Sequence, residues 1–391
     1  MTFVVSLGSV LISSAKVVAA SRQDVPEGID SVSTPGDWES LADQSSFVWA
    51  PTGATQVPGT FLSTHETKVF NKTLWVSGDT VAAQATGIGV SGKDVNLTNA
   101  GTIYVTSGEQ GVTWQNKAIW AGNGATAVNE GKIVAKNAYG MTVGKGDTGS
   151  KLINEGWIYV EEQGAGIELG GATGSEAVNS GTIVVDAPAE DKFGHGVLIN
   201  TEGNTFTNAG RIEASGDATA IEVKDAADNT TIELMAGSSI DGEIHIAGDI
   251  QSTTINAKGF SGKIDLNSEA TDGVDLIIED GTNLELEDGY GSTISNAHIK
   301  DGMLSASIWQ ADNKFQNVVV EQNGIFNVTK LNSGGTATDL ENDPHDQLLI
   351  KSANYTMNGG KLYVAGGEYD GKLKIGTETE TGTFTVNSGD Y

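Results

Sequence analysis

Short stretches in which apolar and polar residues alternate recur along most of this chain. One recurring phrase has the form Asn-x-Gly-x-Ile, and its successive copies lie 30, 25, 25 and 29 residues apart. A second phrase, a Gly or Ala followed by an apolar residue, alternates with the first. Alternation over three or four residues is typical of short β-strands. The apolar positions of the second phrase are Ile88, Ile119, Met141, Ile167, Val197 and Ile221.

The two phrases predict a fold in which short strands stack from one repeat to the next. Strands this short cannot bury an apolar face alone, whereas coils stacked along an axis bury a continuous apolar column and pair the backbones of neighbouring coils. We therefore expect an all-β protein, a right-handed parallel β-helix or β-solenoid. Regular coils are expected over residues 67–223. Less regular coils are expected over residues 224–391, where the period loosens and the last phrase is cut short at Tyr391.

Each copy of the first phrase pairs an asparagine with a glycine two residues later. A lone buried Asn costs about 1–3 kcal/mol, but one Asn per coil can hydrogen-bond to the Asn above and below it. We predict such a structural ladder, with the glycine at a tight corner that needs a positive φ or a close backbone approach. The alternative is that these are exposed Asn-Gly turn residues. The predicted ladder comprises Asn99, Asn129, Asn154, Asn179 and Asn208.

The first 20 residues have the features of a signal peptide. Residues 2–15 are largely apolar, and the small residues Val18-Ala19-Ala20 suit cleavage after Ala20. Lys16 ends the apolar run before the roughly 20 residues that a membrane-spanning helix needs. We therefore expect export rather than a membrane anchor, although no positive charge precedes the apolar stretch. Residues 21–66 contain four of the six prolines and are expected to form an irregular N-terminal leader or cap.

The return from the first phrase to the second is longer in two of the coils, over residues 106–117 and 186–196. Both returns fall on the same corner, three coils apart, which is roughly 14 Å at about 4.8 Å per strand. Insertions on one face of a solenoid often mark its binding face. The candidate binding residues on these two loops are Trp114, Phe193 and His195.

Charge and composition exclude several classes of function. The chain of 391 residues has 22 Lys and Arg against 51 Asp and Glu, a formal net charge of −29. Such a chain offers no basic surface to nucleic acid or to anionic lipid. It has no Cys, which excludes disulfides, thiolate zinc sites and Cys nucleophiles.

Two short motifs resemble catalytic sequences but lack the residues that the chemistry needs. Gly146-Asp147-Thr148-Gly149 is one residue from the Gly-Asp-Ser-Gly motif of chymotrypsin-like proteases, and Thr148 stands at the nucleophile position. Phe193-Gly-His195-Gly resembles the Gly-His-Gly segment of polygalacturonases, but the carboxylate motifs that accompany it there are missing. We predict that the protein is not an enzyme and has no catalytic residues.

Acidic clusters occur at Glu161-Glu162, at residues 186–191 and at residues 341–346. They could supply the oxygen ligands that Ca²⁺ prefers, but none matches an EF-hand loop or the repeat of calcium-binding β-rolls, so a solvated acidic face is the simpler interpretation. The histidines outside the two returns show no spacing typical of metal sites. We predict no bound metal and no cofactor.

Some phrases resemble the passenger domains of autotransporter adhesins of the self-associating and diffuse-adherence type, which are pectin-lyase-like β-helices. They are the Asn-Ser-Gly-Thr-Ile phrase at residues 179–183, Ser-Gly-Gly-Thr-Ala at residues 333–337 and Asn-Gly-Gly at residues 358–360. The resemblance covers about residues 68–391. It implies a secreted or cell-surface virulence protein of the Gram-negative outer membrane, a rigid acidic rod that mediates attachment between cells or to a host.

The same resemblance implies partners: a host glycan, a host surface protein or a second copy of the chain. Proteins of this kind end in a membrane β-barrel of alternating segments, which this sequence does not include. We therefore expect contact with a membrane only through a barrel that is absent from this chain.

An alternative from another functional class is a carbohydrate-active β-helix enzyme, either a polysaccharide lyase or a glycoside hydrolase. Such an enzyme would need two or three carboxylates that converge on one groove of the solenoid. The positions of the outward-facing Asp and Glu side chains would therefore distinguish the two functions.

Overall fold

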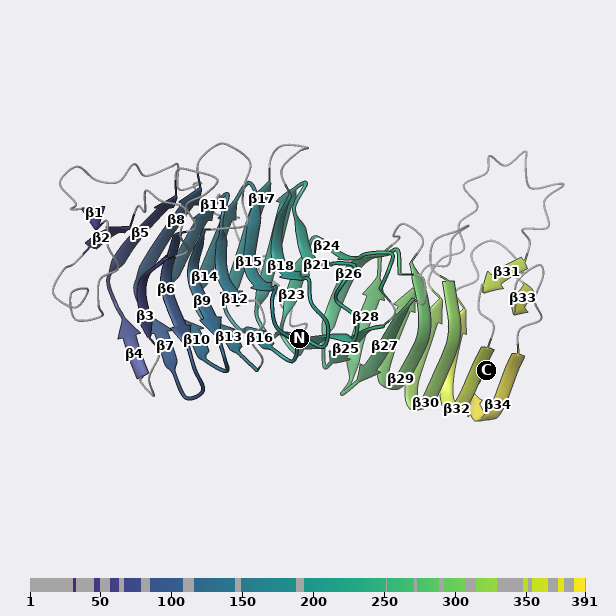
Figure 1. The fold of residues 1–391 in the computed structure, drawn as a ribbon. Helices are drawn as coiled ribbons and strands as arrows, with labels where there is room; N and C mark the ends of the chain where they lie inside the picture. Colours follow the sequence, from purple (N-terminus) through teal and green to yellow (C-terminus); the bar gives the residue numbers. More distant parts are fainter. Residues whose placement is uncertain are drawn as a thin grey trace, which may run out of the picture.

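The computed structural model describes most of the chain between residues 67 and 328, with shorter segments on either side. These residues form strands and turns, with no helix among them, and Figure 1 shows the strands stacked along one axis. The prediction of an all-β solenoid with parallel strands is confirmed for this part of the chain. The described ranges are 31–32, 46–49, 57–62, 67–78, 85–107, 116–144, 149–187, 193–250, 252–270, 273–287, 292–306, 314–328, 347–350, 354–364, 372–375 and 383–390.

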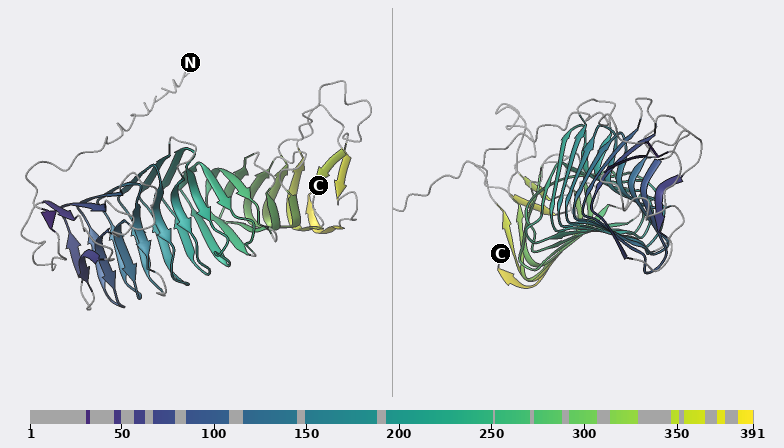
Figure 2. Two further views of the ribbon diagram at one scale, coloured as in Figure 1. Left: turned by 45° about the horizontal axis from the view of Figure 1, so that its top comes forward. Right: turned by 90° about the vertical axis from the view of Figure 1, so that its left-hand side faces the viewer.

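Three parallel sheets form the sides of the solenoid as far as residue 241, and their coils superimpose in the view along the axis (Figure 2, right). Sheet A consists, in order, of β1 (Ser31–Val32), β2 (Ser46–Trp49), β5 (Thr73–Gly78), β8 (Thr102–Ser107), β11 (Lys132–Lys136), β14 (Trp157–Glu161), β17 (Thr182–Ala187), β20 (Arg211–Gly216) and β23 (Ser239–Asp241). Sheet B consists of β3 (Val57–Leu62), β6 (Ala85–Ser91), β9 (Lys117–Gly122), β12 (Tyr139–Val143), β15 (Gly164–Leu169), β18 (Gly194–Ile199), β21 (Thr219–Val223) and β24 (Glu243–Ile246). Sheet C consists of β4 (Thr67–Phe70), β7 (Asn96–Asn99), β10 (Thr126–Asn129), β13 (Lys151–Asn154), β16 (Glu176–Asn179), β19 (Thr205–Asn208), β22 (Thr230–Met235) and β25 (Thr253–Lys258).

Beyond residue 241 the coils have two sides instead of three, because sheet A ends at β23. The paired residues Asp275 and Asn296 of adjacent coils are only 21 residues apart, whereas the earlier coils advance by 25 to 30 residues. Two further strands pair with each other, β31 (Gln347–Ile350) and β33 (Lys372–Ile375). The later coils are built from β26 (Ser261–Ser268), β27 (Val274–Glu279), β28 (Thr282–Leu286), β29 (Thr293–Ala306), β30 (Lys314–Val328), β32 (Asn354–Val364) and β34 (Thr383–Asp390).

Strand stacking begins earlier in the sequence than the alternation suggests. Within residues 21–66, for which we expected an irregular leader or cap, β2 pairs with β5 and β3 pairs with β6, both in parallel register. Pro58 lies in β3, and proline cannot donate to a ladder, so it is found on edge strands. The rest of this segment, and the signal peptide predicted at residues 1–20, lie outside the described residues.

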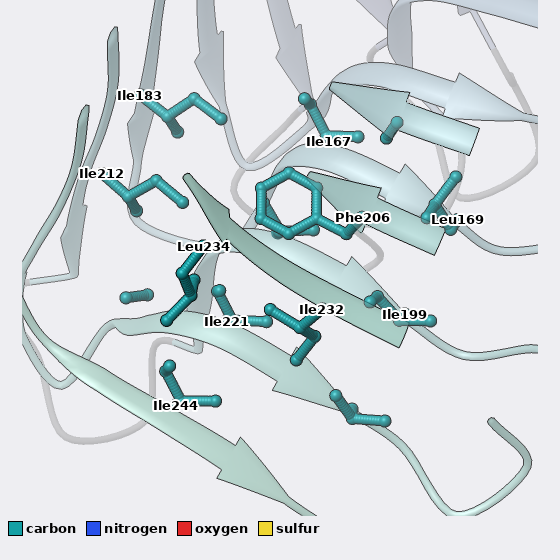
Figure 3. Close-up of a cluster of buried hydrophobic side chains, with 14 of the residues drawn as sticks. Ile167, Leu169, Ile183, Ile199, Phe206, Ile212, Ile221, Ile232, Leu234 and Ile244 are labelled. Atoms are coloured by element: carbon teal, nitrogen blue, oxygen red, sulfur yellow. The ribbon is translucent and has the colours of Figure 1, made fainter. Parts of the chain in front are cut away.

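One continuous apolar core runs through the interior, from Leu62 in the first coils to Met357 near the end. It forms because alternate residues of every strand face inward and occupy the same position in the next coil. Figure 3 shows this packing, with Phe206 of sheet C between aliphatic side chains of the other two sheets. Burying each such side chain contributes about 1.5–3 kcal/mol. The inward column of sheet A alone contains Ile103, Ile133, Ile158, Ile183 and Ile212, all fully buried.

The five asparagines of the first phrase lie in one buried column at the corner between sheets C and A, as their spacing predicts. Each is 0% exposed. Each side-chain amide donates from Nδ2 to Oδ1 of the asparagine in the next coil, over 2.7, 2.8, 2.8 and 2.9 Å. The column ends where the register places Phe70 before Asn99 and Leu234 after Asn208. The last amide donates to the carbonyl of Ser239 instead, at 3.3 Å.

The glycine that follows each of these asparagines is required by a close approach of the backbone and not by a positive φ. A Cβ on Gly131 would lie 2.1 Å from the carbonyl oxygen of Gly101, and one on Gly156 would lie 2.2 Å from that of Gly131. Real Cβ atoms do not come this close to another atom. The corner therefore holds two adjacent columns, one of asparagine side chains and one of glycine backbones.

Candidate functional site

The residues predicted to bind partners from the two long returns fall in different places. Trp114 lies outside the described residues, and so does Thr148 of the protease-like motif. Phe193 is exposed, with 64% of its surface accessible. Both returns connect sheet A to sheet B, and at the base of the first one the Asn116 amide donates to the carbonyl of Thr106 at 2.8 Å.

The placement of His195 on an exposed loop is wrong. His195 is the second residue of β18 and is only 8% exposed. Its backbone pairs with Ala165 of β15 and with Thr219 of β21, so the strand holds it against the body of the solenoid. The second phrase predicts the strand around Val197, but the Phe-Gly-His-Gly sequence gives no apolar alternation, so the extension of β18 back to Gly194 is recognisable only from its register with the neighbouring coils.

His195 belongs to a surface that we call the sheet B face, the outer side of sheet B between β9 and β24. Residues of this face alternate with core residues, as Leu198 does with Val197 and Ile199. A side column of the face contains Lys117, Tyr139, Ala165 and His195. The central column contains, coil after coil, Trp120, Thr142, Glu168, Leu198, Glu222 and His245.

Apolar contacts hold the middle of the sheet B face together. Tyr139, Ala165 and Leu198 form a buried cluster separate from the main core. Burial raises the pKa of the Tyr139 hydroxyl, and the nearby charge of Glu168 raises it further. The tyrosine therefore stays neutral and its ring remains part of the packing.

Glu168 occupies a place that a glycine leaves open. A Cβ on Gly170 would lie 2.6 Å from the carboxylate carbon and from Oε1 of Glu168, so a larger residue there would displace the Glu168 side chain. The Asn200 amide donates to Glu168 Oε1 at 3.2 Å. Burial raises the pKa of Glu168, while Lys117 and Asn200 oppose this change. Burial also lowers the pKa of the Lys117 ammonium.

Glu222 lies further along the central column and is held by a histidine and a lysine. Its carboxylate contacts His245 Nδ1 at 2.9 Å and Lys224 Nζ at 3.0 Å. Burial alone would raise the pKa of Glu222, but these two hydrogen bonds outweigh it and keep the pKa below its usual range. The same hydrogen bond to Glu222 raises the pKa of His245. Burial lowers the pKa of His195 to about 4, so its ring is neutral at neutral pH.

Three buried polar atoms of this surface lack a hydrogen-bond partner in the part of the chain that the structure describes. They are Thr142 Oγ1, His195 Nδ1 and Asn200 Oδ1. A buried polar group without a partner costs about 1–3 kcal/mol, and most such groups in folded proteins are satisfied by protein, water or ligand. Similar atoms occur on sheet A, at Trp75 and Ser107, and on sheet C, at Thr253 and Asn256, so the three beside sheet B make this face one candidate binding surface.

Over the described ranges, no group of three or more His, Asp or Glu side chains is placed to hold a metal ion. In the acidic pair Glu161-Glu162, both carboxylates contact Lys136 Nζ, at 2.7 and 3.2 Å. Both carboxylates of this pair therefore form ion pairs with Lys136 on the outer surface of the solenoid. Within the same ranges, no helix is long and apolar enough to span a membrane.

The sequence analysis did not identify the sheet B face. Its central column mixes Trp, Thr, Glu, Leu and His, so it has no residue type in common, unlike the Asn ladder. The signal that could have found it is the second phrase itself, since the face consists of the residues that alternate with that phrase's apolar positions. Glu168, Leu198 and Glu222 each follow one of them directly.

Residues 60–242 match the family model described as the BigA third pectate lyase-like domain. The match begins within β3 and ends one residue after β23, so it covers most of the three-sided part of the solenoid and the sheet B face from β9 to β21. Together with the parallel β-solenoid, it supports a pectate lyase-like β-helix. No curated protein matches the chain, and no solved structure does.

Proposed function

We propose that this protein is an exported surface adhesin, a rigid β-solenoid that attaches cells to one another or to a host. The observation that carries the proposal is the sheet B face, where aromatic, charged and unpartnered polar side chains from successive coils share one rigid scaffold. A rigid scaffold lowers the ordering cost of binding. The match to a BigA domain supports a bacterial surface location, and export through a signal peptide at residues 1–20 belongs to the same proposal.

The partners in this proposal are a host glycan, a host surface protein or a second copy of the chain. Exposed Phe193 lies next to the sheet B face, at the start of β18, and is available to anchor a partner. The outer side of sheet A offers further aromatic surface, since Trp75 stacks on Tyr104 with ring centroids 5.3 Å apart.

A passive binding role suits the chemistry of the sheet B face. Glu222 is engaged by His245 and Lys224, and a histidine with a pKa of about 4, such as His195, is a weak base at neutral pH. The space along the central column between the two carboxylates is occupied by Leu198, which packs against Tyr139. We therefore propose that the protein has no enzymatic activity.

One observation favours the alternative, a glycoside hydrolase. Glu168 and Glu222 occupy the same column two coils apart, which is about 10 Å between backbones. Their pKa values are shifted in opposite directions, as for the acid and the base of such enzymes. Release of reducing ends from neutral polysaccharides, lost in Glu168→Gln and in Glu222→Gln but kept in Glu233→Gln, would establish the enzyme in place of the adhesin.

The adhesin proposal is tested by attachment of beads that carry the purified chain. We expect these beads to attach to epithelial cells, or to one another, more than beads that carry albumin. Replacing residues 108–115 and 188–192 with Gly-Ser links should lower attachment while the β-rich circular dichroism spectrum is unchanged. Attachment equal to that of the albumin beads would refute the proposal.

A further inference from the structure

We propose that the sheet B face binds an uncharged oligosaccharide along the solenoid axis, with Thr142, Asn200 and His195 as hydrogen-bonding groups. This inference rests on the proposed adhesin function and names the class of ligand for it. Within the described residues, no group donates to or accepts from three of their atoms, Thr142 Oγ1, Asn200 Oδ1 and His195 Nδ1.

The unpartnered atoms match the hydroxyl groups of a neutral sugar. They are a hydroxyl, an amide oxygen and a ring nitrogen, and the histidine is 92% buried, since only 8% of it is exposed. Each can exchange a hydrogen bond with an alcohol, and none needs a charged partner. A ligand that completes them recovers the cost of leaving them unsatisfied, about 1–3 kcal/mol each.

The Thr142 hydroxyl lies between two partly exposed side chains. In the central column Thr142 is flanked by Trp120 on one side and Glu168 on the other, both of which are partly exposed. Binding to the hydroxyl requires a rotamer change of Trp120, and side-chain rotamer changes are common when ligands bind. The indole of Trp120 then offers an apolar surface beside the hydrogen-bonding group, as sugar-binding sites require.

Charge restricts the ligand to uncharged sugars. The chain carries a net charge of −29, and Glu168 and Glu222 both lie in the central column. An anionic polysaccharide would be repelled by these carboxylates. The two lysines of this surface interact with these same carboxylates. Lys117 interacts electrostatically with Glu168, and Lys224 forms an ion pair with Glu222.

The spacing of the groups sets the length of the ligand. Thr142 lies in β12 and His195 in β18, two coils later, so their backbones are about 10 Å apart along the axis. The rise of one coil is close to the length of one pyranose unit in an extended chain. The site therefore accommodates at least two consecutive sugar units.

The test is the binding of neutral hexasaccharides of glucose, mannose, galactose and N-acetylglucosamine to the full chain, with hexagalacturonate as the charged comparison. We expect at least one neutral hexasaccharide to bind and hexagalacturonate not to bind. Thr142→Val should weaken that binding about ten-fold, the equivalent of one hydrogen bond. It should leave the melting temperature unchanged or raise it, because the hydroxyl has no partner to lose.

The chain offers two matched controls in β25 of sheet C. Thr253 in β25 also has a buried Oγ1 without a partner, so Thr253→Val should behave like Thr142→Val in stability and like the wild type in binding. Asn256 resembles Asn200 in two ways. Its amide donates to a glutamate, Glu279, at 3.1 Å, as Asn200 donates to Glu168, and its Oδ1 has no partner. Asn200→Ala should therefore weaken binding, and Asn256→Ala should not.

Failure of this inference can be told apart from failure of the adhesin proposal. If the beads attach to cells but no neutral hexasaccharide binds, the ligand class is wrong and the adhesin remains. The inference is also overturned if Thr142→Val binds as tightly as the wild type, or if Thr253→Val weakens binding equally. In that case ordered water satisfies the three groups and the face has no sugar site.

Discussion

Single asparagine side chains determine how the coils stack at the corner between sheets C and A. Each inner ladder amide accepts from one coil and donates to the next, so Asn129, Asn154 and Asn179 each have two neighbours that depend on them. Such interactions in a low-dielectric interior strengthen one another. The ladder should consequently be sensitive at any of its inner positions.

Replacing Asn154 with Leu should lower the free energy of unfolding by about 1–3 kcal/mol or more. The substitution leaves Asn179 Oδ1 without its donor and Asn129 Nδ2 without its acceptor. Chemical denaturation monitored by circular dichroism measures the loss. Asn283→Leu, at an exposed position of β28, is the matched control and should change stability little. Equal effects of the two substitutions would contradict a structural ladder.

His195 makes the stability of the fold depend on pH. Its pKa is about 4 in the folded chain and near 6.5 when unfolded, so the unfolded chain takes up the proton first as the pH falls. The contribution of His195 is therefore complete above about pH 6.5 and is lost between pH 6.5 and 4, up to about 3 kcal/mol. His245 has a raised pKa and acts in the opposite direction, because its contribution is lost as the pH rises.

The effect of His195 is isolated by comparing His195→Gln with the wild type from pH 8 to pH 4.5. The difference in the free energy of unfolding between the two should change steadily below pH 6.5. His298→Gln, which removes a partly exposed histidine paired with Glu321, is the control. A difference that does not vary with pH would show that His195 is not buried as a neutral ring.

At the scale of elements, the corners determine which residues each coil can use. The strands of sheets A and C meet over the glycine column, where no side chain fits. The corner between sheets A and B is looser, and it accommodates returns of different lengths as well as the left-handed residues Asn137 and Glu162. Loop length therefore varies at the two corners that border sheet B, and it is nearly constant at the corner between sheets C and A.

Glycines of the corner column should tolerate replacement by alanine less well than glycines elsewhere in the solenoid. Gly156→Ala would place a Cβ 2.2 Å from the carbonyl oxygen of Gly131, and because backbone cannot move aside as a side chain can, the cost should reach about 3 kcal/mol or more. Gly248→Ala meets only ordinary contacts at 3.5 Å and should be tolerated. The melting temperatures of the two variants measure the difference. If Gly156→Ala has the melting temperature of the wild type, the backbones of neighbouring coils do not approach this closely at the corner.

The elements that sequence alone predicts are those in which one coil repeats the chemistry of the next. The Asn-x-Gly-x-Ile phrase identifies the ladder and the sheet A column because the same residue types recur at the same register. His195 was misplaced because its environment comes from Ala165 and Thr219, which are 30 and 24 positions away and have no chemistry in common with it. The strands in residues 46–62 were missed because prolines interrupt the alternation there.

At the scale of the whole molecule, a rod with a net charge of −29 should repel its own copies at low ionic strength. Salt screens this repulsion, since the Debye length falls from about 30 Å at 0.01 M to about 8 Å at 0.15 M. Self-association of the purified chain should therefore increase with sodium chloride concentration. Sedimentation velocity at several salt concentrations measures it, and association that weakens with added salt would mean that the contact is made by complementary charges.

The central claim is that the protein attaches through the sheet B face of a passive solenoid. The most direct measurement is the attachment to epithelial cells of beads carrying one of two paired variants, each with the melting temperature of the wild type. The account predicts that Trp120→Ala with Asn200→Ala, on the sheet B face, lowers attachment at least ten-fold. It predicts that Trp157→Ala with Asn256→Ala, on the outer sides of sheets A and C, attaches like the wild type. Full attachment by the first pair would contradict the account.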